Sequence, residues 1–304
     1  MSAAVTCEHL TRRFGALSAV DDVSLNVPTG EIFGLIGPDG AGKTTLMRLF
    51  AGILTPTSGR AQVAGYDVVA DPEGVKRHIG YLSQVFSLYT DLTVQENLDF
   101  VADIYGESRA WAQQAKAEML ALTGLAPFAG RLAGRLSGGM KQKLALMCAL
   151  IHRPRVLLLD EPTTGVDPLS RRDFWRILAD LPAQGVTVVL SSPYMDEAAR
   201  CHRLALIDRG RVLAVGSAPE IAALAAGTVV EVVAADVRGT ARRLGDQPHL
   251  AGLTVYGDAL HVRLSLPRAA ALAQVRTALA DTPVEAISEA EPSLEDAFVE
   301  LVSR

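Results

Sequence analysis

Apolar runs of strand length alternate with helical periodicity along most of the first 225 residues. Residues 32–36 and 155–159 form apolar runs, which is typical of strands buried on both faces of a parallel sheet. Toward the C-terminus the alternation predicts helices at 170–181 and 195–201 and strands at 186–191, 203–208 and 211–215. This rhythm predicts an α/β fold with helices packed on a sheet.

Two stretches depart from this alternation. Residues 23–27 alternate between apolar and polar with period 2, so we predict an edge sheet over 5–27. From residue 93 onward the pattern turns helical, with segments at 93–105 and 109–122 that contain few β-branched residues. This block interrupts the α/β rhythm and predicts an inserted helical subdomain over about 93–152.

The C-terminal region has a different element order. We predict strands and helices, in sequence, at 228–234, 236–245, 252–256, 259–265, 268–280 and 283–288. The order β-α-β-β-α-β matches a ferredoxin-like split unit. An amphipathic helix at 293–302 is expected to pack back on it. We therefore expect two domains, at 1–225 and 226–304.

A glycine-rich segment joins the apolar run at 32–36 to a predicted helix start at 46. It consists of Gly37, Pro38, Asp39, Gly40, Ala41, Gly42, Lys43, Thr44 and Thr45. Strand, glycine-rich loop, Lys-Thr and helix form the P-loop pattern, in which backbone N–H groups and a helix N-terminus surround phosphate oxygens. We predict that this segment binds nucleotide phosphates, with Lys43 reaching the β- and γ-phosphates and Thr44 holding Mg²⁺.

Composition excludes several classes of protein. The 304 residues are 49% hydrophobic and 21% charged, as in an ordinary folded protein. A net charge of -5 argues against nucleic-acid binding. No apolar stretch reaches the roughly 18 residues of a membrane span, and the N-terminus lacks a secretory signal pattern. The three cysteines share no metal-ligand spacing, so we expect buried thiols in a cytosolic protein.

Further motifs follow the P-loop in a fixed order. Gln84 follows a predicted strand and precedes LSGGM at 136–140, VLLLDEP at 156–162 and TGVD at 164–167. Over roughly residues 5–225 the chain resembles the ATP-binding cassette (ABC) ATPases. The resemblance implies a P-loop ABC cassette with a mixed core sheet and a helical subdomain, here followed by a small α+β ferredoxin-like domain.

A finer resemblance is to the nucleotide-binding subunits of ABC-2-type exporters of drugs and antibiotics. It is carried by residues 136–143 (LSGGMKQK), 194–198 (YMDEA) and 292–298 (PSLEDAF). The resemblance implies an ATP-hydrolysing subunit that powers export through separate ABC-2-type transmembrane subunits. Such a subunit is cytoplasmic and peripheral on the inner face of the cell membrane. A single cassette without a long coiled coil argues against ABC ATPases that act on ribosomes or DNA.

The resemblance also implies roles for single residues, in a chemistry that depends on positioning and charge neutralisation. Asp160 is implied to bind Mg²⁺, largely through water, and Glu161 to orient and polarise the attacking water. Gln84 would sense the γ-phosphate and Mg²⁺, so that Gln84, Lys43 and Glu161 form the catalytic set. Phe14 aligns with an aromatic residue that stacks on the adenine of ATP, with burial in the core as the alternative.

Head-to-tail dimerisation follows from the same family architecture. Ser137, Gly138 and Gly139 are implied to cap the γ-phosphate bound by a second subunit, with Asp167 at the interface. The partner is either a second copy of this chain or another ABC ATPase subunit. Closure of the dimer is driven by ATP.

Three apolar residues directly after the Gln84 loop are candidates for contact with the membrane subunits. Phe86, Leu88 and Tyr89 could receive a helix of the transmembrane partner. The alternative is ordinary packing against the helical subdomain.

Pro193 departs from the family pattern, which usually has a histidine before the segment at 194–198. That histidine hydrogen-bonds the γ-phosphate, whereas proline has neither a side-chain donor nor a backbone N–H. His152 and His202 lie in the wrong places to substitute. One hypothesis is that Glu161 suffices and gives a slow ATPase. The other is a degenerate site, weakly hydrolytic, in a subunit that pairs with a second, complete ATPase domain.

Overall fold

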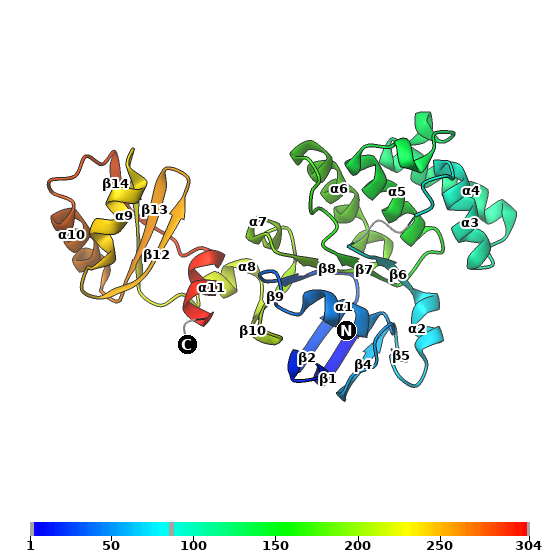
Figure 1. Ribbon diagram of the computed structural model, residues 1–304, viewed down its shortest axis with the longest axis horizontal. Helices are drawn as coiled ribbons and strands as arrows, with labels where there is room; N and C mark the ends of the chain where they lie inside the picture. The colour runs from blue at the N-terminus through cyan, green and yellow to red at the C-terminus, as the bar shows by residue number, and fades with distance from the viewer. Residues whose placement is uncertain (1–2, 85–87, 303–304) are drawn as a thin grey trace. The chain divides into compact units, whose positions relative to one another are not determined.

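The computed structural model describes residues 3–84 and 88–302, and the chain falls into two compact units, Met1–Val212 and Leu213–Arg304 (Figure 1). The boundary between these units, at 212/213, lies before the boundary expected at 225/226. The difference arises because α8 (Ala218–Ala222) packs on α11 (Leu294–Val302), which places it in the second unit. Ile221 of α8 is fully buried.

The central sheet has the strand order β10-β9-β3-β8-β7-β6, and all of it belongs to the first unit except the last residues of β10. Its strands are β3 (Ile32–Ile36), β6 (Ile79–Leu82), β7 (Val156–Asp160), β8 (Thr187–Ser192), β9 (Arg203–Asp208) and β10 (Arg211–Gly216). Strand β3 runs parallel to β8 and β9, and β7 runs parallel to β6 and β8. Every residue of β3, β7 and β8 is buried, which explains their apolar sequences. The predicted α/β core is confirmed.

An antiparallel sheet packs beside this core. It contains β1 (Ala3–Phe14), β2 (Leu17–Pro28), β4 (Ser58–Val63) and β5 (Tyr66–Asp67), in the order β2-β1-β4-β5. Side chains of both sheets and of α1 (Lys43–Phe50) form one hydrophobic core, which includes Leu10, Val23, Phe33 and Leu46. Helix α2 (Pro72–His78) follows β5. The edge sheet predicted over 5–27 is present as β1 and β2.

The helical subdomain has a hydrophobic core of its own. It comprises α3 (Val94–Ile104), α4 (Arg109–Thr123) and α5 (Gly138–Leu150), with short 3-10 turns at Ala126–Phe128 and Ala133–Arg135. Each of these α-helices begins at a hydroxyl side chain that accepts a backbone N–H bond: Thr93, Ser108 and Ser137. Figure 1 shows this group of helices at the end of the central sheet where β6 lies.

Helix α6 (Pro168–Asp180) and a 3-10 turn (Pro182–Gln184) connect β7 to β8, and α7 (Met195–Ala198) follows β8. We predicted a helix over 195–201, which is too long. The N–H groups at 200 and 201 bond to carbonyl oxygens three residues earlier (3.0 and 3.1 Å), as in a tight turn. The N–H of His202 then donates to the carbonyl of Ile32 (2.9 Å). Pairing with β3 therefore ends the helix.

The second unit has the predicted ferredoxin-like order. It contains β11 (Thr228–Val233), α9 (Val237–Gly245), β12 (Leu250–Tyr256), β13 (Ala259–Leu264), α10 (Arg268–Ala278) and β14 (Ala286–Ala290). The strand order is β12-β13-β11-β14, with antiparallel pairing of β11 to both β13 and β14 and of β12 to β13. Strand β14 begins at Ala286 instead of the predicted 283, where Pro283 has no N–H for the ladder.

Helix α11 is fastened to this sheet by charged pairs. Asp296 lies 3.1 Å from Nδ1 of His261, and Glu300 pairs with Arg263, which is almost completely buried. The bond to Asp296 raises the pKa of His261 above its usual value. Burial acts to raise the pKa of Asp296, but its bonds to His261 and Ser293 outweigh burial and lower that pKa. Each partner therefore favours the charged form of the other.

We expect the second unit to lose stability as the pH rises above about 6.5. The folded unit holds the proton of His261 more tightly than the unfolded chain, so this stabilisation is complete below the unfolded pKa. It is lost as the pH rises through the raised folded pKa. The melting temperature of the full chain, measured between pH 6 and 9, tests this loss of stability.

The variant His261→Gln should flatten this pH dependence. His249→Gln is the matched control, because His249 is an exposed histidine of the same unit. If the melting temperature changes equally steeply with pH in the wild type and in His261→Gln, the assignment of this pH dependence to His261 is contradicted.

Candidate nucleotide-binding site

The glycine-rich loop leaves the carboxyl end of β3 and enters a helix, as predicted, but α1 begins at Lys43, three residues before the predicted start at 46. Only glycine fits at two positions: a Cβ on Gly37 would lie 2.0 Å from the carbonyl oxygen of Ile207, and one on Gly42 would lie 2.2 Å from that of Ala19. Gly42 also has a φ of +100°. No side chain caps the start of α1, so its first N–H groups can meet an anion.

A cavity of about 600 Å³ opens beside this loop. Its lining includes residues 40–45 of the loop together with Phe14, Glu161 and Arg209. Phe14 is 45% exposed, so it is not part of the core. The guanidinium of Arg12 lies 4.6 Å from the centre of its ring. The aromatic side chain is therefore available at the cavity wall.

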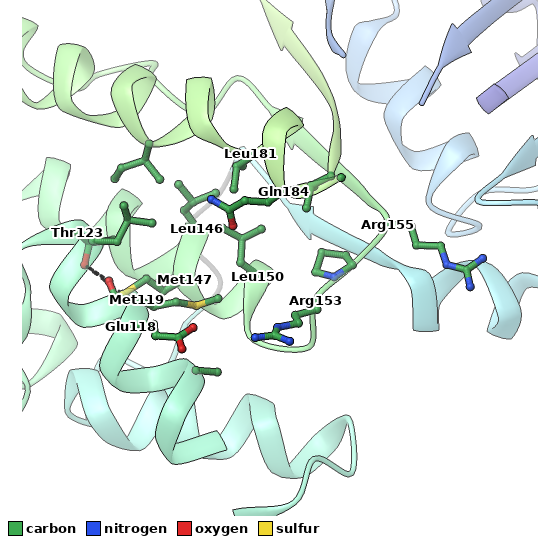
Figure 2. A pocket seen from close by; sticks show the side chains of 16 residues that line it. Glu118, Met119, Thr123, Leu146, Met147, Leu150, Arg153, Arg155, Leu181 and Gln184 are labelled. Carbon is green, nitrogen blue, oxygen red and sulfur yellow. Dashed lines mark hydrogen bonds between the residues drawn. The ribbon is translucent and has the colours of Figure 1, made fainter. Parts of the chain in front are cut away.

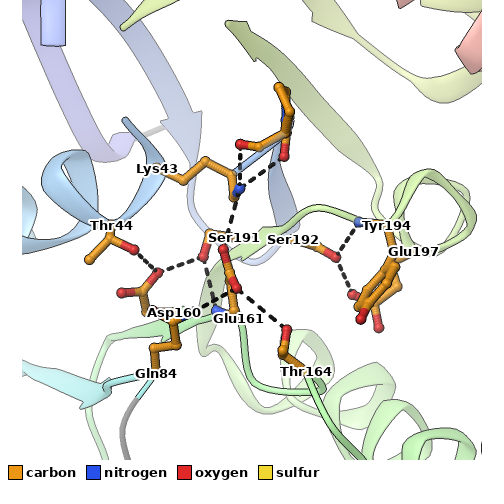
Figure 3. A network of polar contacts seen from close by, with 12 residues as sticks. Lys43, Thr44, Gln84, Asp160, Glu161, Thr164, Ser191, Ser192, Tyr194 and Glu197 are labelled. Atoms are coloured by element: carbon orange, nitrogen blue, oxygen red, sulfur yellow. Dashed lines mark hydrogen bonds and ion pairs between the residues drawn. The ribbon is translucent and has the colours of Figure 1, made fainter. Parts of the chain in front are cut away.

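Lys43 is buried at the base of the loop, with 3% of its side chain exposed. Its Nζ donates to the carbonyl oxygens of Gly37 and Pro38, both at 2.9 Å, and lies 3.3 Å from Oε1 of Glu161. Figure 3 shows these contacts converging on one ammonium group. This cation compensates a carboxylate that is itself almost buried.

Asp160 ends β7 and is buried. Its Oδ1 accepts hydrogen bonds from Oγ1 of Thr44 (3.0 Å) and Oγ of Ser191 (2.8 Å). Among the described residues its Oδ2, which is also buried, has no hydrogen-bond partner. An unpartnered buried carboxylate oxygen is costly. Carboxylate and hydroxyl oxygens are the ligands that Mg²⁺ prefers, so the donor set fits that ion.

Glu161 follows directly and has a left-handed backbone, with a φ of +49°. Its Oε2 accepts from Nε2 of Gln84 (2.9 Å) and from Oγ1 of Thr164 (3.4 Å). Its N–H donates to Oγ of Ser191 (2.9 Å). The structure thus brings together Gln84, Lys43, Thr44, Asp160 and Glu161, as the sequence predicted.

Ser191 and Thr164 were not predicted as site residues. Ser191 contacts Asp160 at the end of β7 and Glu161 in the turn after it, whereas the sequence predicted residues 186–191 only as a strand. A usable signal was present: the serines at 191 and 192 end a strand parallel to β7. The carboxyl ends of adjacent parallel strands share an edge of the sheet.

The Ser-Gly-Gly motif lies apart from this cavity. Ser137 caps α5 by accepting the N–H of Met140 (3.3 Å), and Ser137 and Gly138 are exposed. A Cβ on Gly139 would lie 2.3 Å from Oγ of Ser170. None of the three motif residues lines the cavity beside the P-loop.

Asp167 caps α6 by accepting the N–H of Ser170 (3.0 Å), a bond that lowers the pKa of its carboxyl group. Asp167 is exposed. It lies close to the Ser-Gly-Gly motif, because a Cβ on Gly139 would be 3.7 Å from Oδ2 of Asp167.

The apolar residues after Gln84 differ in their surroundings. Leu88 is half-buried and packs against the core of the helical subdomain, as the packing alternative expects. Tyr89 is 51% exposed, and its ring meets that of Phe100 edge to face at 4.9 Å. Phe86 lies outside the described residues. A cavity of about 360 Å³ beside these residues is also lined by Ile104.

A larger cavity, of about 670 Å³, lies between α4, α5 and the region around the 3-10 turn at Pro182–Gln184. Figure 2 shows Met119, Met147, Leu150 and Leu181 around it. None of the predicted nucleotide or metal residues lines this cavity. Cavity size therefore does not identify the nucleotide site, whereas the convergence of charged groups does.

The P-loop, the paired carboxylates at the end of β7 and the buried parallel sheet define a P-loop nucleotide-binding protein. Residues 20–164 match the family model described as ABC transporter. The chain belongs to the ABC transporter family of ATP-binding proteins. In the described residues no helix is both long and apolar enough to cross a membrane.

The family assignment rests also on relatives. The chain is 40% identical to "Probable multidrug ABC transporter ATP-binding protein YbhF" of Escherichia coli, covering 99% of this chain and 52% of that protein. It thus spans about half of that relative's length. It is 35% identical to "Daunorubicin/doxorubicin resistance ATP-binding protein DrrA" of Streptomyces peucetius, covering 98% of this chain and 92% of that protein.

A solved structure agrees with the fold. It is a dimeric post-hydrolysis state of an ATP-binding cassette bound to ADP and Pi, with a TM-score of 0.64 and 26% identity. The match covers 70% of this chain and 98% of that one.

Ser191→Ala should lower the free energy of unfolding of the first unit by about 1–3 kcal/mol, because it leaves the buried N–H of Glu161 without its acceptor. Urea unfolding without nucleotide measures it. Ser24→Ala is the matched control: Ser24 accepts the N–H of His9 at an exposed position, where water can replace it. Equal losses for the two variants would contradict the prediction.

Proposed function

We propose that this chain binds ATP with Mg²⁺ at the P-loop and hydrolyses it to power export through separate membrane subunits. The observation that carries the proposal is the convergence of Lys43 (3.3 Å) and Gln84 (2.9 Å) on the carboxylate of Glu161, beside the loop. The names of the relatives, which describe a multidrug transporter and drug resistance, support export.

The loop and Lys43 would bind the phosphates. Backbone N–H groups of residues 40–45 and the N-terminus of α1 would surround the phosphates, and the ammonium group would meet the β- and γ-phosphates. Phe14 would stack on adenine at the cavity wall, where its exposure allows contact. The loop residues Gly37, Pro38 and Asp39 set the path of the chain from β3 into this cradle.

Thr44, Asp160 and Gln84 would hold Mg²⁺. The unpartnered Oδ2 of Asp160 supports this assignment, as does the hydroxyl of Thr44 on the same carboxylate. The amide nitrogen of Gln84 faces Glu161, which leaves its amide oxygen as a ligand. When bound, Mg²⁺ neutralises phosphate charge and orients the γ-phosphoryl group.

Glu161 would act on the attacking water. Its carboxylate accepts a hydrogen bond from the water, orients it toward the γ-phosphorus and receives its proton as the new P–O bond forms. Gln84 holds the carboxylate in place, and Lys43 stabilises the negative charge on the phosphoryl oxygens. The bond between the γ-phosphorus and the β–γ bridging oxygen breaks, so ADP is the leaving group and phosphate is the product.

A second cassette would complete each site. Ser137, Gly138 and Gly139 lie away from the chain's own P-loop cavity, and the first two are exposed at the N-terminus of α5. In a head-to-tail dimer they would cap the γ-phosphate of the partner, with Asp167 beside them. The similarity to a dimeric cassette supports this arrangement.

The membrane partner would be an ABC-2-type subunit, and it would contact the helical subdomain of this chain. This chain would then lie on the cytoplasmic face of the cell membrane. Tyr89, Phe100 and Ile104 expose apolar surface beside one cavity, and Ile104 is 63% exposed. Such a surface suits an apolar helix of a partner.

Pro193 supports a second candidate, in which the chain is weakly hydrolytic and pairs with a complete ATPase domain. Pro193 offers no hydrogen-bond donor to a γ-phosphate. The exposed Ser-Gly-Gly motif could still complete the partner's site.

Hydrolysis of MgATP by the chain should clearly exceed that of Glu161→Gln, which keeps the shape of the side chain but cannot accept the proton. Steady-state phosphate release measures both, with Pro193→His alongside. Wild-type activity at the level of Glu161→Gln, together with rescue by Pro193→His, would replace the first candidate by the second. No activity with the membrane subunits present would contradict both.

Ile104→Asp should abolish co-purification with the membrane subunits, because it places a charge on the apolar docking surface. Leu122→Asp is the matched control, since Leu122 is an exposed leucine on α4 of the same subdomain. Undiminished co-purification of Ile104→Asp would rule out docking at this surface.

A further inference from the structure

A second buried carboxylate, Glu197 on α7, accepts a hydrogen bond from Thr163, two residues after Glu161, and has no role in the mechanism above. It is 0% exposed. Four side chains donate to it: Thr163 (2.6 Å), Arg171 (2.7 Å), Trp175 (2.9 Å) and Ser192 (2.5 Å). Figure 3 shows Glu197 bonded to Ser192, which directly follows Ser191 in the group of contacts around Glu161.

The hydrogen bonds to Glu197 favour its ionised form despite its burial. Burial acts to raise its pKa, but the bonds from Ser192, Thr163, Trp175 and Arg171 outweigh that effect and lower the pKa below its usual value. Each of these bonds to a charged acceptor is stronger than a neutral one. Loss of one donor therefore leaves a buried charge incompletely compensated.

The donors connect Glu197 to both segments that hold the catalytic carboxylate. Thr163 lies two residues after Glu161 in the turn that follows β7. Ser192 follows Ser191, whose hydroxyl contacts both Asp160 and the N–H of Glu161. The carbonyl oxygen of Ser192 also accepts the N–H of Gly37, the first residue of the P-loop (3.2 Å).

The backbone at Glu161 needs such support. A φ of +49° is unfavourable for a residue with a side chain and persists only where the surroundings fix it. The hydroxyl of Ser191 accepts the N–H of Glu161, and the carbonyl of Glu161 accepts the N–H of Thr164 (3.3 Å). Glu197 accepts hydrogen bonds from Ser192, which follows Ser191, and from Thr163, which precedes Thr164.

We propose that Glu197 is a positioning residue for hydrolysis: through Thr163 and Ser192 it holds the turn that directs the Glu161 carboxylate. The proposal rests on the proposed ATP hydrolysis. The segment around Pro193 then contributes to hydrolysis without a histidine, because Ser192, next to Pro193, helps to fix the position of Glu161. Nucleotide binding depends on the loop and Lys43, whereas Thr163 lies in the turn after Glu161, so we expect the contact between Thr163 and Glu197 to act on turnover more than on affinity.

Thr163→Val tests the proposal, because it keeps the shape of the side chain and removes the donor to Glu197. We expect kcat to fall by about 10- to 100-fold, as for a small displacement of a catalytic group. The Kd for a fluorescent ATP analogue should stay within about threefold of the wild type, since the P-loop is unchanged. Thr163→Ser keeps the hydroxyl and should restore kcat.

Two further variants separate positioning from general stability. Glu197→Gln should lower kcat like Thr163→Val, and the double variant should lose little more, because both changes break one network. Asp196→Asn is the matched control: Asp196 is an exposed neighbour that also contacts Arg171 (3.0 Å), and its kcat should equal that of the wild type.

The outcomes distinguish this inference from the proposed function. Wild-type hydrolysis no greater than that of Glu161→Gln, with membrane subunits present, overturns the proposed function and the inference with it. Wild-type hydrolysis above that level, but unchanged kcat in Thr163→Val, overturns the inference alone. So does a fall in kcat that is matched by an equal loss of nucleotide affinity or that Thr163→Ser does not restore.

Discussion

The burial of two adjacent carboxylates at the end of β7 is the constraint on which this site depends. Asp160 and Glu161 are adjacent in the sequence and both are buried, and buried carboxylates destabilise a fold unless cations or hydrogen-bond donors compensate them. Lys43 supplies the nearby cation, and Thr44, Gln84 and Ser191 supply hydrogen bonds. The residues that compensate these charges are also those suited to hold a phosphate and its metal.

The parallel sheet provides this compensation through its topology. The order β3-β8-β7 places three carboxyl ends along one edge, so the P-loop, the serines that end β8 and the paired carboxylates meet there. Buried apolar strands keep the ends in register, and the glycines at 37 and 42 let the loop pass close to other backbone segments. The core thus determines where the polar groups lie.

The phosphate-binding loop could be predicted from a local pattern, because a P-loop after an apolar strand specifies its own geometry. The roles of Gln84 and of the Asp160-Glu161 pair were expected from the resemblance to ABC ATPases. The exposure of Phe14 depends instead on how the turn between β1 and β2 directs its ring, which local sequence does not specify. Ser191 contacts the carboxylates only through pairing of β8 with β7. The place of α8 in the second unit likewise depends on its distant partner α11.

Glu161 and Glu197 are two buried carboxylates whose charges the protein compensates in different ways. Glu197 accepts from four side chains and has no exposed surface, so its charge is fixed and its surroundings are rigid. Glu161 forms an ion pair with Lys43 and accepts hydrogen bonds from Gln84 and, at 3.4 Å, from Thr164. Lys43 and Gln84 are also the groups proposed to engage the nucleotide and its metal. A rigid carboxylate next to an adaptable one is the arrangement expected where one charge must stay in place so that the other can act.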